Sequence, residues 1–337
     1  MLLTFVKFVI LKHKAHFWKG IIMGTKISII GAGNVGSTIA YTLTVTGAAS
    51  EIVMIDIAQE KLLGEALDIS QASPFSKSVN VYAGTYEDAK DSDIVVITSG
   101  IGRRPGQSRL DLAQTNINII KSIAPQILKY APNAVYIIVS NPVDILTYEF
   151  IKISDLPKGR VFGTGTSLDT ARLRTRLSDY LQIDPKTVNA YVLGEHGDSS
   201  FIPWSLARIA GVPLAEFHAA VNPLTKLPLE LDYNEIENYV CTSGSSIIKR
   251  KGATFYGVSS CVAYYCRRII DNMDTVMVAS TILEGEYGIS DVALSLMSVI
   301  NGSGVKCTLT PTLTEEELAK LHNSAKVLKD VIAQLNF

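Results

Sequence analysis

The sequence has little cysteine, no excess of either charge and no long uninterrupted apolar run, and each shortage excludes a class of protein. Its four cysteines, Cys241, Cys261, Cys266 and Cys307, lack both Cys-x-x-Cys spacing and the density of a disulfide-stapled domain. The 31 basic and 32 acidic residues leave no basic surplus for phosphate backbones or anionic membranes. We therefore expect reduced thiols, a cytoplasmic location, no metal, and neither nucleic acid nor membrane as a partner.

The start of the chain is the only stretch that resembles a targeting signal. An apolar run from Met1 to Leu11 is broken by Lys7, basic residues follow the run instead of preceding it, and no small-residue cleavage site appears. A membrane span needs roughly 18 uninterrupted apolar residues. A signal anchor is therefore disfavoured, and we interpret residues 1–22 as an extension of doubtful origin ahead of a natural start at Met23.

The remaining chain alternates between strand-like and helix-like segments. Its 337 residues exceed the roughly 250–300 at which a single core stops growing, so two domains are expected. Near-continuous apolar runs such as KISIIG, EIVMID, DIVVIT and AVYIIVS are typical of parallel strands covered on both faces by helices. We expect a Rossmann-type doubly wound α/β sheet over residues 23–165 and a mixed α+β substrate domain over residues 166–337.

Two helices are bounded by sequence signals. One should run from Val35 to about Thr46, directly behind a glycine-rich turn. The last should begin at Thr314, where TEEEL supplies a cap and an acidic first turn, and continue to Leu335.

The glycine-rich turn GAGNVG follows the first strand and opens a helix. Glycines there permit a tight turn and close approach of the backbone to a pyrophosphate, although GxGxxG alone is weakly specific. Asp56 ends the next strand, 20 residues after Gly36, where a carboxylate can accept from ribose hydroxyls and repel a 2′-phosphate. This context favours NAD over NADP. The residues expected at the nucleotide are Gly31, Gly33, Asn34, Val35, Gly36 and Asp56.

Three further clusters point to acid–base chemistry on an anionic substrate. His196 lies among small and polar residues with Asp198 nearby, and an imidazole can exchange a proton with a carbonyl oxygen or an alcohol. Asp169 and Arg172 share one helix face, where a solvated i,i+3 ion pair is the plain alternative.

The third cluster is the segment from Ser99 to Leu110, SGIGRRPGQSRL, which follows a strand and holds three arginines. Loops at the carboxyl ends of parallel strands are where ligands bind, although a solvated basic loop remains the alternative. Asn141 follows the next strand and should reach the same edge.

Together these motifs resemble the lactate/malate dehydrogenase family over essentially the whole chain from Met23 onward. GAGNVG, SGIGRRPGQSR, SNPVDILT, LDTAR, GEHGD and GATFYG occur in the family's order and with similar spacing. The resemblance implies a hydride transfer between NAD and a small L-2-hydroxy acid.

The resemblance also implies roles for individual residues. His196 would be the proton donor and acceptor, and Asp169 would orient it. Arg172 would bind the substrate carboxylate as a bidentate pair, and Arg109 would polarise the reacting carbonyl once its loop closes. The further residues implied at the substrate or cofactor are Arg103, Asn141, Thr254, Ser99 and Gly100.

Two signals disagree about the substrate. Glu195, Trp204 and GATFYG resemble the lactate branch, whereas Arg103 stands where lactate enzymes usually carry glutamine and malate enzymes carry arginine. A desolvated guanidinium facing the methyl group of pyruvate would lack a partner, but it would pair strongly with the second carboxylate of oxaloacetate. We favour pyruvate and L-lactate, keep oxaloacetate and malate open, and note that Arg103 facing solvent would remove the conflict.

Assembly and regulation are implied only by the resemblance. It implies a homotetramer, with a dimer as the alternative. Bacterial lactate enzymes often bind fructose 1,6-bisphosphate through an arginine and a histidine; Arg174 matches the arginine, but Asn189 replaces the histidine, which leaves activation open. The rival classes are a non-catalytic NAD-binding scaffold, which would lack one of the four catalytic side chains, and an NAD-using glycosidase, which would need a metal-binding cluster.

Overall fold

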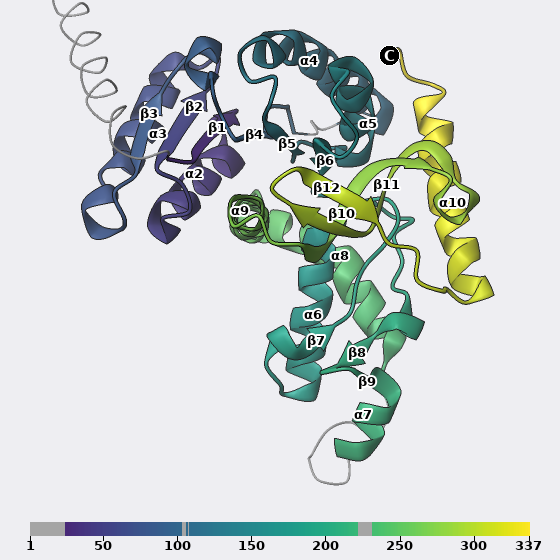
Figure 1. The fold of residues 1–337 in the computed structure, drawn as a ribbon. Coiled ribbons are helices and arrows are strands. Elements are labelled where there is room, and N and C mark those ends of the chain that lie inside the picture. Colours follow the sequence, from purple (N-terminus) through teal and green to yellow (C-terminus); the bar gives the residue numbers. More distant parts are fainter. Residues whose placement is uncertain (1–23, 103–105, 107, 222–230) are drawn as a thin grey trace, which may run out of the picture.

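The computed structural model describes residues 24–102, 106, 108–221 and 231–337 (Figure 1). The extension over residues 1–22 and the specificity candidate Arg103 lie outside the described residues.

The first half of the chain forms the predicted parallel sheet with its helices. In chain order its elements are β1 (Lys26–Ile30), α2 (Asn34–Thr46), β2 (Glu51–Ile55), α3 (Gln59–Ser70), β3 (Asn80–Ala83), β4 (Ile94–Ile97), α4 (Arg109–Tyr130), β5 (Val135–Ile138), α5 (Val143–Ser154) and β6 (Val161–Gly163). The strands lie in the order β6-β5-β4-β1-β2-β3. The order reverses between β1 and β4, and ligands bind outside the carboxyl ends of the strands at such a switch point.

The same sheet continues into the second half of the chain. After α6 (Ser167–Leu181), the long antiparallel strands β10 (Thr275–Glu284), β11 (Ser290–Asn301) and β12 (Gly304–Thr308) extend it to nine strands. β10 joins β6 through the pair Ser280 and Gly163. The fold class is therefore the predicted one, and a single sheet runs through the boundary expected at residue 165.

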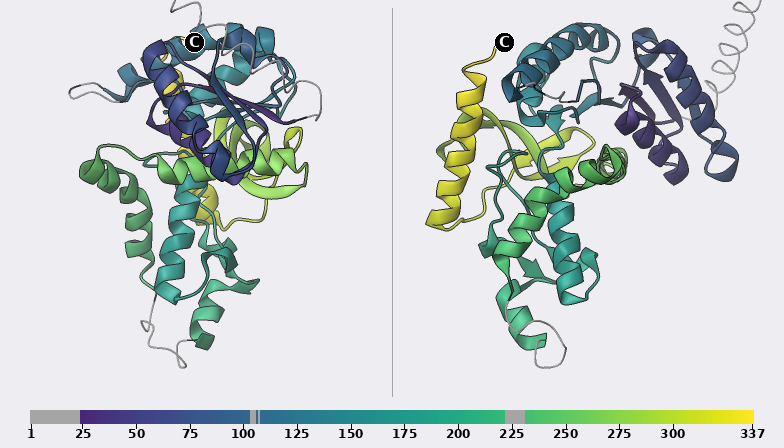
Figure 2. Two further views of the ribbon diagram at one scale, coloured as in Figure 1. Left: turned by 90° about the vertical axis from the view of Figure 1, so that its left-hand side faces the viewer. Right: turned by 180° about the vertical axis from the view of Figure 1, so that it is seen from behind.

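The other elements of the second half are β7 (Val188–Asn189), β8 (Arg208–Ile209), β9 (Val212–Pro213), α7 (Leu214–Val221), α8 (Tyr233–Lys251), α9 (Tyr256–Ile270) and α10 (Glu315–Ile332). Short 3-10 segments lie at Pro185–Thr187, Trp204–Leu206 and Glu286–Gly288, and the first half has two more, at Ser73–Phe75 and Tyr86–Ala89. Figures 1 and 2 show α6 and α8 side by side below the sheet, and α9 against α2.

Apolar side chains fill both faces of the sheet. One core cluster lies under α4, α5 and α10, and a second lies under α2, α3 and α9. A third lies between α6, α8 and the separate three-stranded sheet β7-β8-β9. Within the described ranges, no helix combines the length and the hydropathy that a bilayer crossing needs.

Candidate active site

The turn between β1 and α2 is built for close approach to an anion. Gly31 has a φ of 108°, and a Cβ on Gly36 would lie 1.9 Å from the carbonyl oxygen of Gly31, so neither position accepts a side chain. Gly33 faces open space, and α2 starts with neither a side-chain cap nor an acidic residue in its first turn. The free backbone N–H groups at this helix end, where Asn34 and Val35 begin the helix, fit a pyrophosphate.

Asp56 is held beside this turn by two backbone groups. Its Oδ2 accepts a hydrogen bond from Ala32 N at 2.6 Å, and its Oδ1 accepts from Ala58 N at 2.8 Å. The half-buried carboxylate thus stands at the end of β2, next to the glycines, with remaining lone pairs for ribose hydroxyls. The donor set and the glycine turn fit NAD.

Asn116 of α4 ties the ends of β4 and β5 together. Its amide donates to the carbonyl oxygen of Asn141 at 2.7 Å and both donates to and accepts from the backbone of Ile101. Ser140 Oγ donates to the carbonyl oxygen of Ser99 at 2.6 Å. These contacts place Ser99, Gly100 and the exposed Asn141 at the same edge of the sheet. Asn116 is not predicted from the sequence, because nothing local distinguishes a buried amide inside a helix.

His196, Asp169 and Arg172 form one contiguous group. Nδ1 of His196 lies 2.6 Å from Oδ2 of Asp169, and Nη1 of Arg172 donates to Oδ1 of the same carboxylate at 2.7 Å. The Asp169 side chain is only 10% exposed, and the exposed fractions of Arg172 and His196 are 15% and 25%. The i,i+3 pair is present, but it is buried and shared with the imidazole, which differs from a solvated ion pair.

Burial and charge oppose each other in this group. Burial lowers the pKa of His196, but the Asp169 carboxylate raises it more, so the pKa lies above its usual range. Burial raises the pKa of Asp169, yet His196 and Arg172 lower it further, and the net direction is downward. The arrangement favours an imidazolium facing an ionised aspartate.

The segment that carries His196 is fastened from several elements. The backbone N–H of His196 donates to Oδ2 of Asp144, a buried residue of α5, at 2.7 Å. Ser324 of α10 accepts from Glu195 N at 2.7 Å, and Glu317 of the same helix accepts from both N and Oγ of Ser205. These anchors were not found in the sequence, because each joins residues far apart in the chain.

Arg109 lies at the start of α4, on the surface, rather than against the imidazole. Its Nη2 forms an ion pair with Oδ2 of Asp198 at 2.6 Å, and both side chains are largely exposed. Asp198 comes two residues after His196, so Arg109 is near the group without contacting it. Thr254 lies half-buried between α8 and α9, and a Cβ on Gly244 of α8 would lie 3.3 Å from Nη2 of Arg172.

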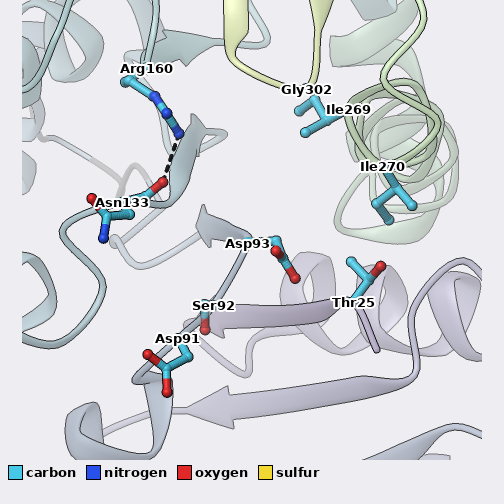
Figure 3. A pocket seen from close by; sticks show the side chains of 9 residues that line it. All are labelled: Thr25, Asp91, Ser92, Asp93, Asn133, Arg160, Ile269, Ile270 and Gly302. Carbon is cyan, nitrogen blue, oxygen red and sulfur yellow. Dashed lines mark hydrogen bonds between the residues drawn. The ribbon is translucent and has the colours of Figure 1, made fainter. Parts of the chain in front are cut away.

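Two cavities lined by described residues lie in different parts of the fold. One of about 470 Å³ lies beside the His196 segment, between α8 and α10, and is lined by Asp198, Cys241 and Lys320 among others. The other, of about 400 Å³, lies at the amino ends of the parallel strands (Figure 3). There Arg160 donates to the carbonyl oxygen of Asn133, and no residue predicted for the site is part of the lining.

Arg174 and Asn189, the two positions compared with the sugar-bisphosphate site, differ in their surroundings. Nε of Arg174 donates to the carbonyl oxygen of Ala190 at 3.0 Å, and the guanidinium lies over the ring of Tyr191. Asn189 is exposed in β7.

Comparison with known proteins covers both halves of the chain. Residues 25–163 match the model of the lactate/malate dehydrogenase NAD-binding domain, and residues 166–336 match that of the α/β C-terminal domain of the same family. An L-lactate dehydrogenase of Thermoanaerobacterium saccharolyticum is 43% identical over 312 residues, which cover 93% of this chain and 99% of the relative. One of Clostridium botulinum is 42% identical over 313 residues, covering 91% and 96%.

Solved structures give the same result. The minor L-lactate dehydrogenase of Enterococcus mundtii superposes with a TM-score of 0.88 at 38% identity, covering 93% of this chain and 99% of that one. The L-lactate dehydrogenase of Clostridium thermocellum superposes with a TM-score of 0.81 at 40% identity, covering 92% and 99%.

Proposed function

The chain belongs to the lactate/malate dehydrogenase family, and we propose that it is an NAD-dependent L-lactate dehydrogenase that reversibly reduces pyruvate. The single observation that carries the proposal is the buried contact of His196 with Asp169 beside Arg172. An imidazole, its carboxylate and a guanidinium suit a substrate with a carboxylate next to a reacting carbonyl.

The imidazole transfers the proton. Because Nδ1 of His196 is held by Asp169, Nε2 is the nitrogen that gives a proton to the carbonyl oxygen and recovers it from the alcohol. The negative charge of Asp169 keeps the ring protonated in the direction of reduction. The nicotinamide supplies the hydride when bound, and the protein supplies position and field.

The two arginines act on different parts of the substrate. Arg172 uses one nitrogen for Asp169, and its remaining N–H groups bind the substrate carboxylate. Arg109 leaves Asp198 and approaches the carbonyl oxygen during turnover. Exposed ion pairs contribute only about 0–1 kcal/mol, so the pair with Asp198 is weak enough to exchange for substrate. Asn141 and Thr254 complete the substrate's surroundings.

Malate dehydrogenase activity is the second candidate, and Arg103 is the observation that favours it. If this side chain enters the site, it pairs with the second carboxylate of oxaloacetate. A well-desolvated pair of this kind changes preference by about a hundredfold.

The deciding experiment measures NADH oxidation with pyruvate and oxaloacetate side by side, in the wild type, Arg103→Gln and the matched neighbour Arg104→Gln. We expect turnover of pyruvate, and a loss of kcat/KM for oxaloacetate of at least about tenfold in Arg103→Gln alone. If the ratio of kcat/KM for pyruvate to kcat/KM for oxaloacetate is the same in both variants, Arg103 does not contact the substrate. Absence of NADH oxidation with either acid would end the dehydrogenase proposal.

Assembly, location and regulation complete the proposal. We propose a cytoplasmic homotetramer, which sedimentation velocity tests against a dimer. Activation by fructose 1,6-bisphosphate should be weak, because Asn189 brings no positive charge and Arg174 is engaged with Ala190. Pyruvate saturation curves with and without the bisphosphate measure this.

A further inference from the structure

A second carboxylate, that of Asp144, contacts His196. It binds the backbone N–H of His196, whereas Asp169 binds the imidazole ring. Asp144 is the second residue of α5 and is 3% exposed. Its Oδ2 accepts from the backbone N–H of His196 at 2.7 Å, and its Oδ1 accepts from Oγ of Ser280 at 2.5 Å. A buried carboxylate is costly, so its position against the His196 backbone calls for a reason.

We infer that Asp144 is a positioning residue for the proton transfer: it fixes the backbone of His196 and adds a second buried negative charge that raises the proton affinity of the imidazole. The inference rests on the proposed function, because it assigns to Asp144 a part in the task proposed for His196. It goes further in naming a carboxylate on a different element, 52 residues away in the sequence.

The surroundings of Asp144 favour its ionised form. Burial raises the pKa of Asp144, and the hydrogen bonds from Ser280 and His196 limit the rise. The net pKa is about 6. The amino end of α5 also favours an anion in its first turn. At neutral pH the group is therefore largely ionised, and its charge reaches His196 through a low-dielectric interior.

The charged groups around His196 come from three segments. Asp169 and Arg172 face it from α6, Asp144 faces it from α5, and Glu195 precedes it in the chain. Asp169 and Asp144 raise the pKa of His196, and Arg172 lowers it. Loss of the Asp144 charge should leave Asp169 as the only group of these that raises the pKa of His196, against burial and Arg172, so the pKa should fall.

The rest of the surroundings supplies a matched control. Thr147 lies one turn after Asp144 in α5, is fully buried, and its Oγ1 has no hydrogen-bond partner among the described residues. Thr147→Val replaces a hydroxyl in the same helix by a methyl group of similar size, and it leaves the charge unchanged. It should alter neither the titration of His196 nor turnover.

The test is Asp144→Asn, in which the amide oxygen still accepts from His196 N and the amide nitrogen can donate to Ser280. Nitrogen-15 histidine NMR follows the imidazole of His196 directly, and kcat/KM for pyruvate is recorded against pH. We expect the pKa of His196 to fall by at least about half a pH unit, and the alkaline limb of the rate profile to move down with it. Thr147→Val should leave both unchanged.

An unchanged His196 titration in folded Asp144→Asn would reduce Asp144 to a structural residue, and an equal shift in Thr147→Val would deny it any specific part. If Asp144→Asn does not fold, Ser280→Ala replaces it. Without that donor the pKa of Asp144 rises and the pKa of His196 should fall; no change would overturn the inference. Failure of the wild type to oxidise NADH would end the proposed function alone, because the NMR titration does not depend on turnover.

Discussion

Asp169 accepts from both His196 and Arg172, so its charge serves the proton donor and the carboxylate-binding group at once. Replacement by asparagine keeps the shape of the side chain but removes the charge that holds the pKa of His196 above its usual range. The neutral amide also offers an N–H where the imidazole needs an acceptor. Both effects act against a correctly oriented imidazolium.

For Asp169→Asn we predict a loss of kcat for pyruvate reduction on the order of a hundredfold or more at pH 7. Reduction requires protonated His196, so activity is present below the pKa of that group and is lost as pH rises through it. A lower pKa therefore moves the alkaline limb to lower pH. Steady-state rates from pH 5 to 9 measure the limb, and an unmoved limb would contradict the assigned pairing.

At the scale of single residues, the sequence predicted the groups that carry recognisable chemistry. His196, Asp169 and Arg172 were named in advance, and the structure brings them together. Asp144 and Asn116 were not, because a buried carboxylate or amide acquires its role from partners that only the fold brings near. Asp144 lies within SNPVDILT, but nothing in that motif marks its carboxylate as a partner of the His196 backbone, and no spacing marks Asn116.

Among the elements, α10 shows how one helix end secures a distant segment. Its cap, Thr314, accepts from Glu317 N, and the Glu317 carboxylate accepts from Thr314 N and from Ser205. The cap was predicted from TEEEL, because a capping box is a local pattern. The link to Ser205 was not, since it spans 112 residues. The helix ends at Ile332 rather than at Leu335.

For Glu317→Gln we predict a loss of stability of about 1 kcal/mol at pH 7, because the charge is lost while the geometry of the cap is kept. Burial raises the pKa of Glu317, but the hydrogen bonds from Ser205 and Thr314 lower it below its ordinary range. A depressed carboxyl pKa contributes stability above the unfolded value of about 4.3, and the contribution is lost as pH falls through the folded pKa.

Urea unfolding of the wild type and Glu317→Gln, at pH 7 and at pH 4 and below, measures this difference. The two proteins should converge in acid. Glu315→Gln, at an exposed position in the same first turn, is the control and should change stability by less than about 0.5 kcal/mol. A constant gap between wild type and Glu317→Gln at every pH would show that charge is not the cause.

At the scale of the whole molecule, the nine-stranded sheet contains strands from both of the domains that the sequence predicts. Composition and length predicted two domains with a junction near residue 165, and the parallel order of the first half followed from its βα pattern. The continuation of β6 into β10 is one register pair between residues 117 positions apart, Gly163 and Ser280. No local pattern specifies such a pairing. The sequence therefore predicted the layers of each half, but not that one sheet runs through both halves.

The sheet and the core that the two halves share have a consequence for unfolding. The core cluster under α4 and α5 contains Tyr136 and Phe150 from the first half together with Leu294 and Leu321 from the second. Separation of the halves would expose the edge of β6 and apolar side chains of this cluster on both sides, and each fully buried side chain of this kind contributes about 1.5–3 kcal/mol. We therefore predict that both halves open in one cooperative step.

Hydrogen exchange followed by mass spectrometry at increasing urea tests this. Peptides over β5, at Val135–Ile138, and over β11, at Ser290–Asn301, should lose protection at the same urea concentration, because their most stable amides exchange only through global opening. Peptides from the short, half-buried 3-10 turn at Glu286–Gly288 are the control and should exchange earlier, because a short turn can open locally. Protection of β5 persisting after β11 has exchanged would mean that the first half folds alone, and that the shared sheet joins two stable units instead of making one.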